Sequence, residues 1–158
     1  MKKLIIISIA AVVIISGSML LRKKEPSADI ISLGSEQRIA VVHKSATCGC
    51  CANYISYLKN EGFAVTAENH IDMGLIKEQY HVPNGLESCH TAVIDGYVVE
   101  GHIPVASIAK LLSESPQVAG IALPGMPAGS PGMGGSKIDS FAVYSFSEIG
   151  GADRYDAQ

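Results

Sequence analysis

Short apolar runs, separated by polar and turn-forming residues, predict alternating strands and helices along most of this chain. Residues 38–43 are rich in β-branched side chains, which is typical of a buried strand. Thr47 is a helix-capping residue type, and apolar positions from Cys51 onwards recur at helical spacing until Gly62 ends the helix. Residues 63–68 predict a second strand.

The pattern continues with a second helix, a hairpin and a third helix. Asp72 is placed to cap the second helix, whose apolar stripe would consist of Leu75, Ile76 and Tyr80. An Asp-Gly pair at residues 95–96 then separates two apolar runs, which is a strong signal for a two-residue hairpin. Pro104 fits the first turn of the third helix. Its inward positions would be Val105, Ile108, Ala109 and Leu112.

The order of the predicted elements indicates the fold class. Residues 113–137 are rich in Pro and Gly and predict a long irregular segment, before a last strand at residues 141–146. The order strand, helix, strand, helix, strand, strand, helix is that of a thioredoxin or glutaredoxin core. We therefore expect an α/β, thioredoxin-like mixed sheet flanked by helices over residues 38–148, with a C-terminal tail at residues 149–158.

The N-terminus carries a hydrophobic segment between two basic groups. Leu4 to Leu21 is uncharged, and as a helix rising about 1.5 Å per residue it would span about 27 Å, close to a bilayer core. This run is long for a signal peptide and no clean cleavage site follows it. Residues 1–24 are therefore expected to form either a single-span membrane anchor or a cleaved signal peptide, followed by a linker at residues 25–37.

Both alternatives favour export, so the domain is expected to be periplasmic or otherwise extracytoplasmic. Positive charge on both sides of the apolar run leaves the orientation rule indecisive, so a cytoplasmic domain on a reversed anchor stays open. The formal net charge of the chain is −3, without a long run of one sign. This argues against a nucleic-acid partner, which calls for a clustered basic face.

Three of the four cysteines are crowded together, as Cys48, Cys50 and Cys51. Cys48 and Cys51 form a C-x-x-C at a predicted strand-to-helix junction, where a thioredoxin-like redox pair is expected and a helix N-terminus stabilises thiolates. Cys50 changes the interpretation, because a third thiol beside a redox pair invites scrambled disulfides. Crowded thiolates instead suit a soft ion such as Cu(I), with zinc as the competing ion.

The hairpin register adds candidate ligands at its open end. With the turn at residues 95–96, counting outward brings His90 opposite Gly101 and Cys89 opposite His102. Cross-strand partners lie about 4.5–5.5 Å apart at Cβ, so both side chains can reach one ion. In a thioredoxin-like sheet this end lies beside the C-x-x-C. We therefore expect Cys89 and His102, together with His90, to complete a mixed sulfur and nitrogen site.

Met126 and Met133 lie in the Gly- and Pro-rich segment, where they have little core to fill. Thioether sulfur is a soft ligand suited to Cu(I). We expect this methionine loop to fold over the cysteine cluster.

Simpler roles stay open for most of these residues. The crowded cysteines could form a structural disulfide, and Cys89 could pair with the odd cysteine of that group. The hairpin histidines and the loop methionines could serve only to orient or pack. His43 is expected to be a satisfied histidine at a strand end, and His70 and His81 are expected to be solvated.

Four sequence blocks together resemble the CopG-like family of exported copper-resistance proteins. The blocks are Thr47-Cys-Gly-Cys-Cys51, Ser88-Cys-His-Thr91, Gly101-His102 with Pro104, and Pro124-Gly-Met-Pro-Ala-Gly-Ser-Pro-Gly-Met133. They stand in the family's order and cover roughly residues 39–146. The resemblance implies a thioredoxin-like fold, copper binding through the Cys-x-Cys-Cys motif, and a role in copper tolerance of the cell envelope. It also implies copper held as a cluster that changes between Cu(I) and Cu(II).

The resemblance carries over the metal-binding role residue by residue. Cys48, Cys50 and Cys51 are implied ligands, and a further set carries over as motif positions. This set consists of Cys89, His90, His102, Met126 and Met133.

Three hypotheses of function follow. The first is an envelope copper-binding protein in copper resistance, whose partners are copper ions and other copper-export or copper-oxidising proteins, with membrane contact through an uncleaved N-terminal segment. The second is a thiol–disulfide oxidoreductase with Cys48 and Cys51 as its catalytic pair. The third is a zinc-stabilised interaction domain. A metal-binding protein is favoured over an enzyme.

Overall fold

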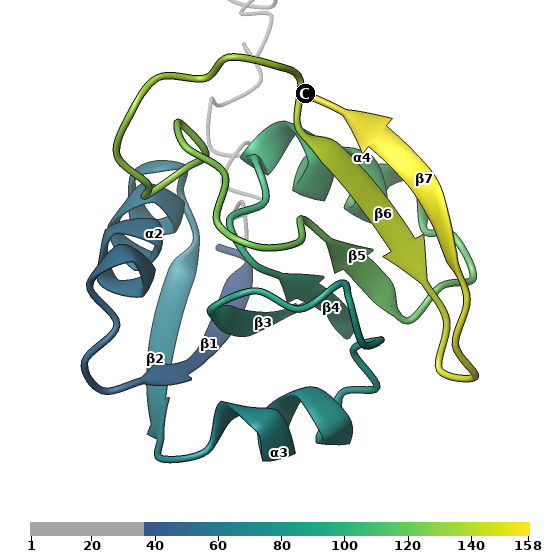
Figure 1. Cartoon of the computed structure of the whole chain (residues 1–158), viewed down its shortest axis with the longest axis horizontal. Helices are drawn as coiled ribbons and strands as arrows, with labels where there is room; N and C mark the ends of the chain where they lie inside the picture. Colours follow the sequence, from purple (N-terminus) through teal and green to yellow (C-terminus); the bar gives the residue numbers. More distant parts are fainter. Residues whose placement is uncertain (1–36) are drawn as a thin grey trace, which may run out of the picture. The chain divides into compact units, whose positions relative to one another are not determined.

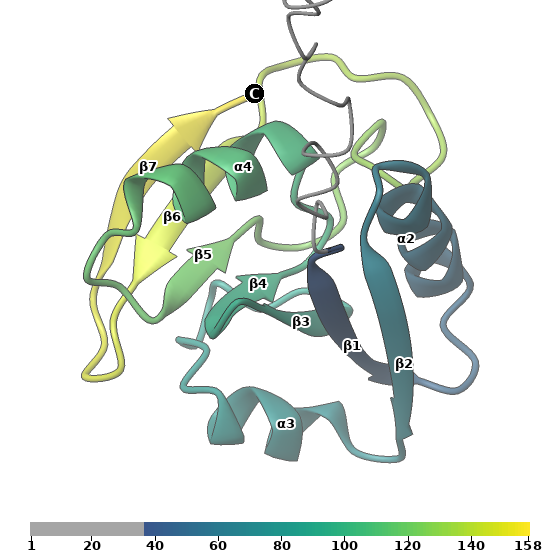
Figure 2. The same cartoon turned by 180° about the vertical axis from the view of Figure 1, so that it is seen from behind.

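The computed structural model describes residues 37–158, so the N-terminal segment at 1–24 and nearly all of the linker at 25–37 lie outside the described residues. The described part is a mixed α/β unit in which helices pack against one seven-stranded sheet (Figures 1 and 2). None of the helices within residues 37–158 is long and apolar enough to cross a membrane.

The elements follow one another in the predicted order before three further strands. They are β1 (Ile39–Ser45), α2 (Gly49–Asn60), β2 (Ala64–His70), α3 (Met73–Gln79), β3 (His90–Ile94), β4 (Tyr97–Glu100), α4 (Val105–Glu114), β5 (Gly120–Ala122), β6 (Ala142–Phe146) and β7 (Ala152–Ala157). The sheet order is β2-β1-β3-β4-β5-β6-β7. Strand β1 runs parallel to β2 and antiparallel to β3, and β3 and β4 form an antiparallel hairpin.

The hairpin has the register that its turn residues predict. Asp95 and Gly96 have positive φ angles of 48° and 85°, as a two-residue turn between twisted strands requires. Ile94 therefore pairs with Tyr97, and Thr91 with Glu100. This register places the residues that precede β3 beside those that follow β4.

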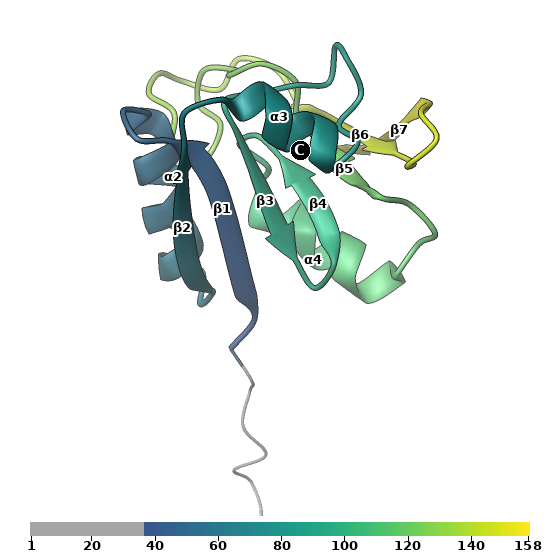
Figure 3. The ribbon, with the colours of Figure 1, turned by 90° about the horizontal axis from the view of Figure 1, so that it is seen from below.

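The core lies on both faces of the sheet. The larger apolar cluster joins the sheet to α2 and α4, with Tyr54, Leu58, Ile108 and Leu111 fully buried. A smaller cluster on the other side includes Val82, in the segment after α3. Figure 3 shows α3 and α4 on opposite sides of the sheet.

The N-cap of α2 and the buried faces of α3 and α4 differ in detail from those expected. Thr47 does not cap α2, because Cys48 takes the N-cap position and its sulfur accepts a hydrogen bond from the Cys51 N–H. Leu75 is 62 % exposed, and Lys77 occupies the buried face of α3 beside Ile76. In α4 the expected Ala109 is exposed, whereas Leu111 is buried. The apolar stripes are therefore rotated from those expected.

Two strands occupy segments in which no strand was predicted. Strand β5 lies inside the segment 113–137, and β7 lies inside the predicted tail at residues 149–158, so both predictions were wrong there. Strand β5 is only three residues long and pairs in parallel with β4. Strand β7 is mostly exposed and polar, and backbone pairing with β6 holds it in the sheet. Neither strand carries an apolar alternation that a sequence pattern reveals.

Candidate metal centre

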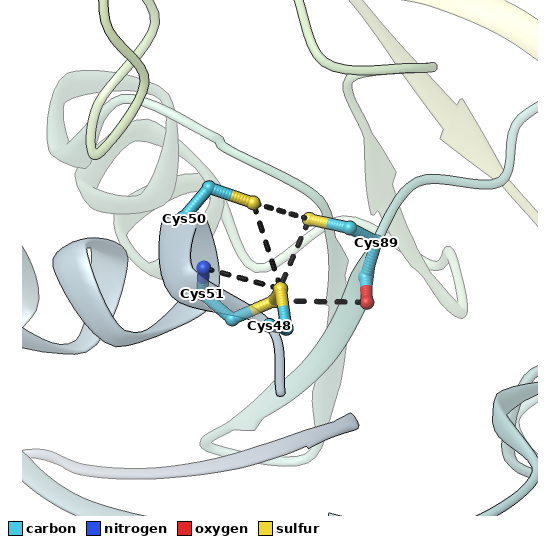
Figure 4. A group of neighbouring side chains, drawn as sticks. All are labelled: Cys48, Cys50, Cys51 and Cys89. Carbon is cyan, nitrogen blue, oxygen red and sulfur yellow. Dashed lines mark hydrogen bonds between the residues drawn. A yellow bond between two sulfur atoms is a disulfide. The ribbon is translucent and has the colours of Figure 1, made fainter. Parts of the chain in front are cut away.

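All four cysteines meet at the N-terminus of α2. Cys48 is the N-cap, Cys50 and Cys51 lie in the first turn, and Cys89 directly precedes β3. Their sulfur atoms all lie within 4.8 Å of one another (Figure 4). The Sγ of Cys50 lies 3.5 Å from that of Cys48 and 3.6 Å from that of Cys89. The predicted grouping of the hairpin end with the Cys-x-Cys-Cys motif is therefore present in the structure.

The spacing of these sulfurs suits a shared metal ion. Two sulfurs bound at about 2.3 Å to one tetrahedral ion are about 3.8 Å apart. Cys89 Sγ lies 3.6 Å from the sulfurs of both Cys50 and Cys51. The contacts of Cys89 with Cys50 and Cys51 therefore have the spacing of a thiolate metal site.

Cys48 and Cys51 are joined by a disulfide, and Cys50 and Cys89 are free. The disulfide closes the C-x-x-C pair of the redox interpretation. The other disulfide considered from the sequence, between Cys89 and the crowded group, is not formed here. Since a disulfide sulfur cannot act as a thiolate, binding by all four sulfurs requires reduction of this bond.

His102 faces Cys89 with a nitrogen that is free to accept. Its Nε2 lies 3.1 Å from Cys89 Sγ, while its Nδ1 lies 2.7 Å from the carbonyl oxygen of Pro131. A carbonyl oxygen only accepts, so Nδ1 carries the proton and Nε2 carries the lone pair. Metal-ligating histidines have this arrangement, in which the second nitrogen is held by an outer partner. The predicted closeness of Cys89 and His102 is thus present, and the orienting partner of His102 is an additional finding.

His90 is the second histidine beside Cys89. Its Nδ1 lies 3.3 Å from Cys89 Sγ, and its ring packs 4.6 Å from that of Tyr54, between centroids. The side chain is fully buried, and its Nε2 has no hydrogen-bond partner among the described residues. Burial, with smaller contributions from His102 and Lys77, lowers the pKa of His90 to about 3. The imidazole is therefore neutral, which is the form that binds metal.

Burial affects the thiol of Cys89 in the opposite sense. Desolvation, reinforced by Cys50, raises the pKa of Cys89 to about 12. Without an ion, Cys89 is thus a neutral thiol that can donate to Nε2 of His102. An ion bound here must displace that proton, so binding would release it.

The methionine loop packs against α2 and the imidazole of His102. Asn53 Nδ2 donates to the carbonyl oxygen of Gly132 over 3.3 Å, and the neighbouring Pro131 carbonyl accepts from His102. Figure 1 shows the segment between β5 and β6 reaching across to α2. Met133 is half-buried next to Gly132, whereas Met126 is 53 % exposed. The loop therefore contacts the centre through its backbone.

Replacing Gly132 by alanine should loosen this loop. Gly132 has a φ of 81°, and a Cβ there would lie 2.6 Å from the backbone nitrogen of Tyr54. We expect a loss of about 2 kcal/mol in the free energy of unfolding, measured by denaturant titration, together with faster proteolysis of the loop. Gly134→Ala is the matched control, since a Cβ at Gly134 meets nothing within 4 Å. Equal stability of the two variants would contradict the observed packing.

A buried ion pair supports the segment that carries Cys89. Glu100 is fully buried and accepts from Lys77 Nζ, from the Ser88 N–H over 2.7 Å and from the Thr91 hydroxyl over 2.6 Å. The contact with Ser88 holds the residue before Cys89. Sequence reasoning missed this network, and the acidic residue ending an apolar strand was its only signal.

Donor types and geometry together are typical of a metal-binding protein with a predominantly sulfur site on a mixed α/β domain. A family model described as "Protein of unknown function, DUF411" matches residues 86–133. No match was found among curated protein sequences.

Two solved structures of the copper resistance protein CopG resemble this chain. Form 2 is 43 % identical, with a TM-score of 0.72, over 78 % of this chain and 99 % of that one. Form 1 is 43 % identical, with a TM-score of 0.71, over 78 % and 98 % of the respective chains. This chain therefore belongs to the CopG copper-resistance family, and the family membership together with the cysteine cluster supports a copper-related function.

Proposed function

We propose that this protein binds Cu(I) through the four clustered cysteines and His102, and that it acts in copper resistance of the cell envelope. The observation that carries the proposal is the position of Cys89, whose sulfur lies within 3.6 Å of two other sulfurs and 3.1 Å from Nε2 of His102. Thiolate and imidazole donors at this density suit a soft monovalent ion. Bridging sulfur would allow more than one ion.

Other parts of the proposal rest on the same framework. The sheet order β2-β1-β3-β4, with β1 parallel to β2 and α2 between them in sequence, supports a thioredoxin-like fold. His90 would assist as a neutral nitrogen donor, and Met126 and Met133 would capture or shield copper at the loop. We further propose an extracytoplasmic location, on the basis of the hydrophobic segment at residues 1–24.

The experiment is a Cu(I) titration of the reduced full chain against a competing chelator. We expect more than one Cu(I) per chain, and a lower number for Cys50→Ser, because Cys50 lies between Cys48 and Cys89. X-ray absorption of the loaded chain should show sulfur-dominated ligation. Unchanged stoichiometry in Cys50→Ser would contradict a three-thiolate motif, and isolation with zinc from copper-stressed cells would favour the zinc-stabilised alternative.

The disulfide favours a second candidate function, thiol–disulfide exchange. Reduced Cys48 and Cys51 would transfer two electrons to a substrate disulfide, forming their own disulfide while the substrate gains two thiols. An external dithiol would then reduce the enzyme again. Insulin reduction without metal tests this candidate. Turnover that survives both Cys50→Ser and Cys89→Ser would favour the oxidoreductase over the copper-binding protein.

A further inference from the structure

A second group of metal-ligand side chains lies on β1 and β2. His43 of β1 pairs with Glu68 of the edge strand β2, and His70 follows Glu68 by two positions. Side chains two apart on a strand share a face, and so do cross-strand partners. The three side chains therefore point to the same side of the sheet.

That side faces away from the cysteines. His43 is the partner of Thr91 in β3, and the Thr91 hydroxyl bonds to Glu100, which pairs with Lys77 of α3. The residue before Thr91, His90, points to the other face and packs on Tyr54 of α2. The two groups of ligands are thus separated by the sheet.

Three donor atoms converge within this second group. Nδ1 of His43 lies 3.0 Å from Nε2 of His70 and 3.3 Å from a carboxylate oxygen of Glu68. The same oxygen lies 3.8 Å from Nε2 of His70. Ligands about 2.0–2.1 Å from one ion are about 2.9 Å apart at a right angle and about 3.4 Å apart at a tetrahedral angle. The triangle is therefore close to one coordination sphere.

The surroundings hold His43 in place and leave His70 and Glu68 accessible to solvent. The Tyr80 hydroxyl lies 3.1 Å from Nε2 of His43. When Nε2 donates to this hydroxyl, Nδ1 carries a lone pair directed at His70 and Glu68. The side chain of His43 is 7 % exposed, against 26 % for His70 and 51 % for Glu68. An ion could therefore enter from solvent and close the site with little rearrangement.

We propose that His43, Glu68 and His70 bind a borderline divalent cation, Cu(II) or Zn(II), at a site separate from the cysteine cluster. Two imidazoles and one carboxylate contain no sulfur, so they favour these ions over Cu(I). Three protein ligands leave a fourth position for water. The site would give the protein a nitrogen and oxygen centre on one face of the sheet, in addition to the proposed sulfur centre on the other.

The test uses the full oxidised chain with the thiols of Cys50 and Cys89 alkylated, because free thiols would bind and reduce Cu(II). Titration with Cu(II), followed by electron paramagnetic resonance, should show one ion with hyperfine coupling to two imidazole nitrogens. His70→Ala should lose one coupled nitrogen and at least tenfold in affinity, since changes in outer-shell partners alone cost about 10–100-fold. Glu68→Gln should also weaken binding, and a parallel calorimetric titration with Zn(II) distinguishes the two ions.

His81→Asn is the matched control. His81 is exposed, lies outside the ligand group and has a positive φ of 54°, which asparagine tolerates. Its Cu(II) affinity and spectrum should match those of the unsubstituted chain. The proposal is overturned if the unsubstituted chain binds neither ion, or if His70→Ala and Glu68→Gln both bind as it does. Cu(I) binding by the reduced His70→Ala chain reports separately on the cysteine cluster and should be unchanged.

Discussion

Cys89→Ser is expected to lower the Cu(I) affinity of the reduced chain by at least about a hundredfold, the upper range for disturbing even a neighbour of a metal ligand. Cys89 connects the candidate ligands of the cysteine cluster. Its sulfur contacts Cys50, Cys51, His90 and His102. A serine hydroxyl is smaller and a poor ligand for a soft ion. The affinity is measured by competition with a Cu(I) chelator of known strength.

The free thiols provide an internal control for this variant. The chain has two free cysteines, so oxidised Cys89→Ser should react with a thiol reagent once under denaturing conditions, where the unsubstituted chain reacts twice. This count shows that one disulfide has formed in each protein, as in the structure, where it joins Cys48 and Cys51. A folded Cys89→Ser chain that binds Cu(I) with full affinity would contradict the proposed centre.

Among the variants proposed here, Glu100→Gln is expected to lower the free energy of unfolding most. Lys77 and Glu100 form an ion pair in which the lysine side chain is 9 % exposed and the glutamate side chain is fully buried. Removing one partner of a buried pair leaves the other charge uncompensated, which costs about 3–5 kcal/mol. In a domain of this size, the melting temperature should fall by roughly 10–20 °C, measured by circular dichroism.

Glu114→Gln is the matched control for this effect. Glu114 also pairs with a lysine, Lys110, but the two side chains are 48 % and 37 % exposed. Exposed pairs contribute about 0–1 kcal/mol, so this variant should unfold within a few degrees of the unsubstituted chain. The double variant Lys77→Met with Glu100→Gln should recover part of the loss. Equal melting temperatures for Glu100→Gln and Glu114→Gln would show that the buried pair contributes no more than the exposed one.

The register of the hairpin between β3 and β4 could be predicted from the local sequence. The Asp95-Gly96 turn sets the register of β3 and β4, and continuing the count outward brought Cys89 opposite His102. Cys89 Sγ lies 3.1 Å from Nε2 of His102. This prediction was possible because a two-residue turn determines every later cross-strand pair. The same holds for the Cys-x-Cys-Cys motif, whose cysteines are brought together by one turn of helix.

One strand pairing and one buried ion pair escaped the sequence pattern. Strand β7 has no apolar alternation and is held by backbone hydrogen bonds to β6, so only the pairing defines it as a strand. Lys77 lies outside the predicted apolar stripe of its helix, yet its side chain bonds to the buried carboxylate of Glu100. Neither partner carries information about the other in its own neighbourhood of the chain.

The sequence by itself determined the element order from β1 to α4, the hairpin register and the crowding of three thiols at one helix start, because each depends on neighbouring residues. Only the tertiary structure decided that Pro131 orients His102, that Glu100 supports Ser88 beside Cys89, and that His43 meets Glu68 and His70. Those contacts depend on the parallel pairing of β1 with β2 and on the packing of α3 and the methionine loop. The energies that decide such packing come from segments far apart in the chain.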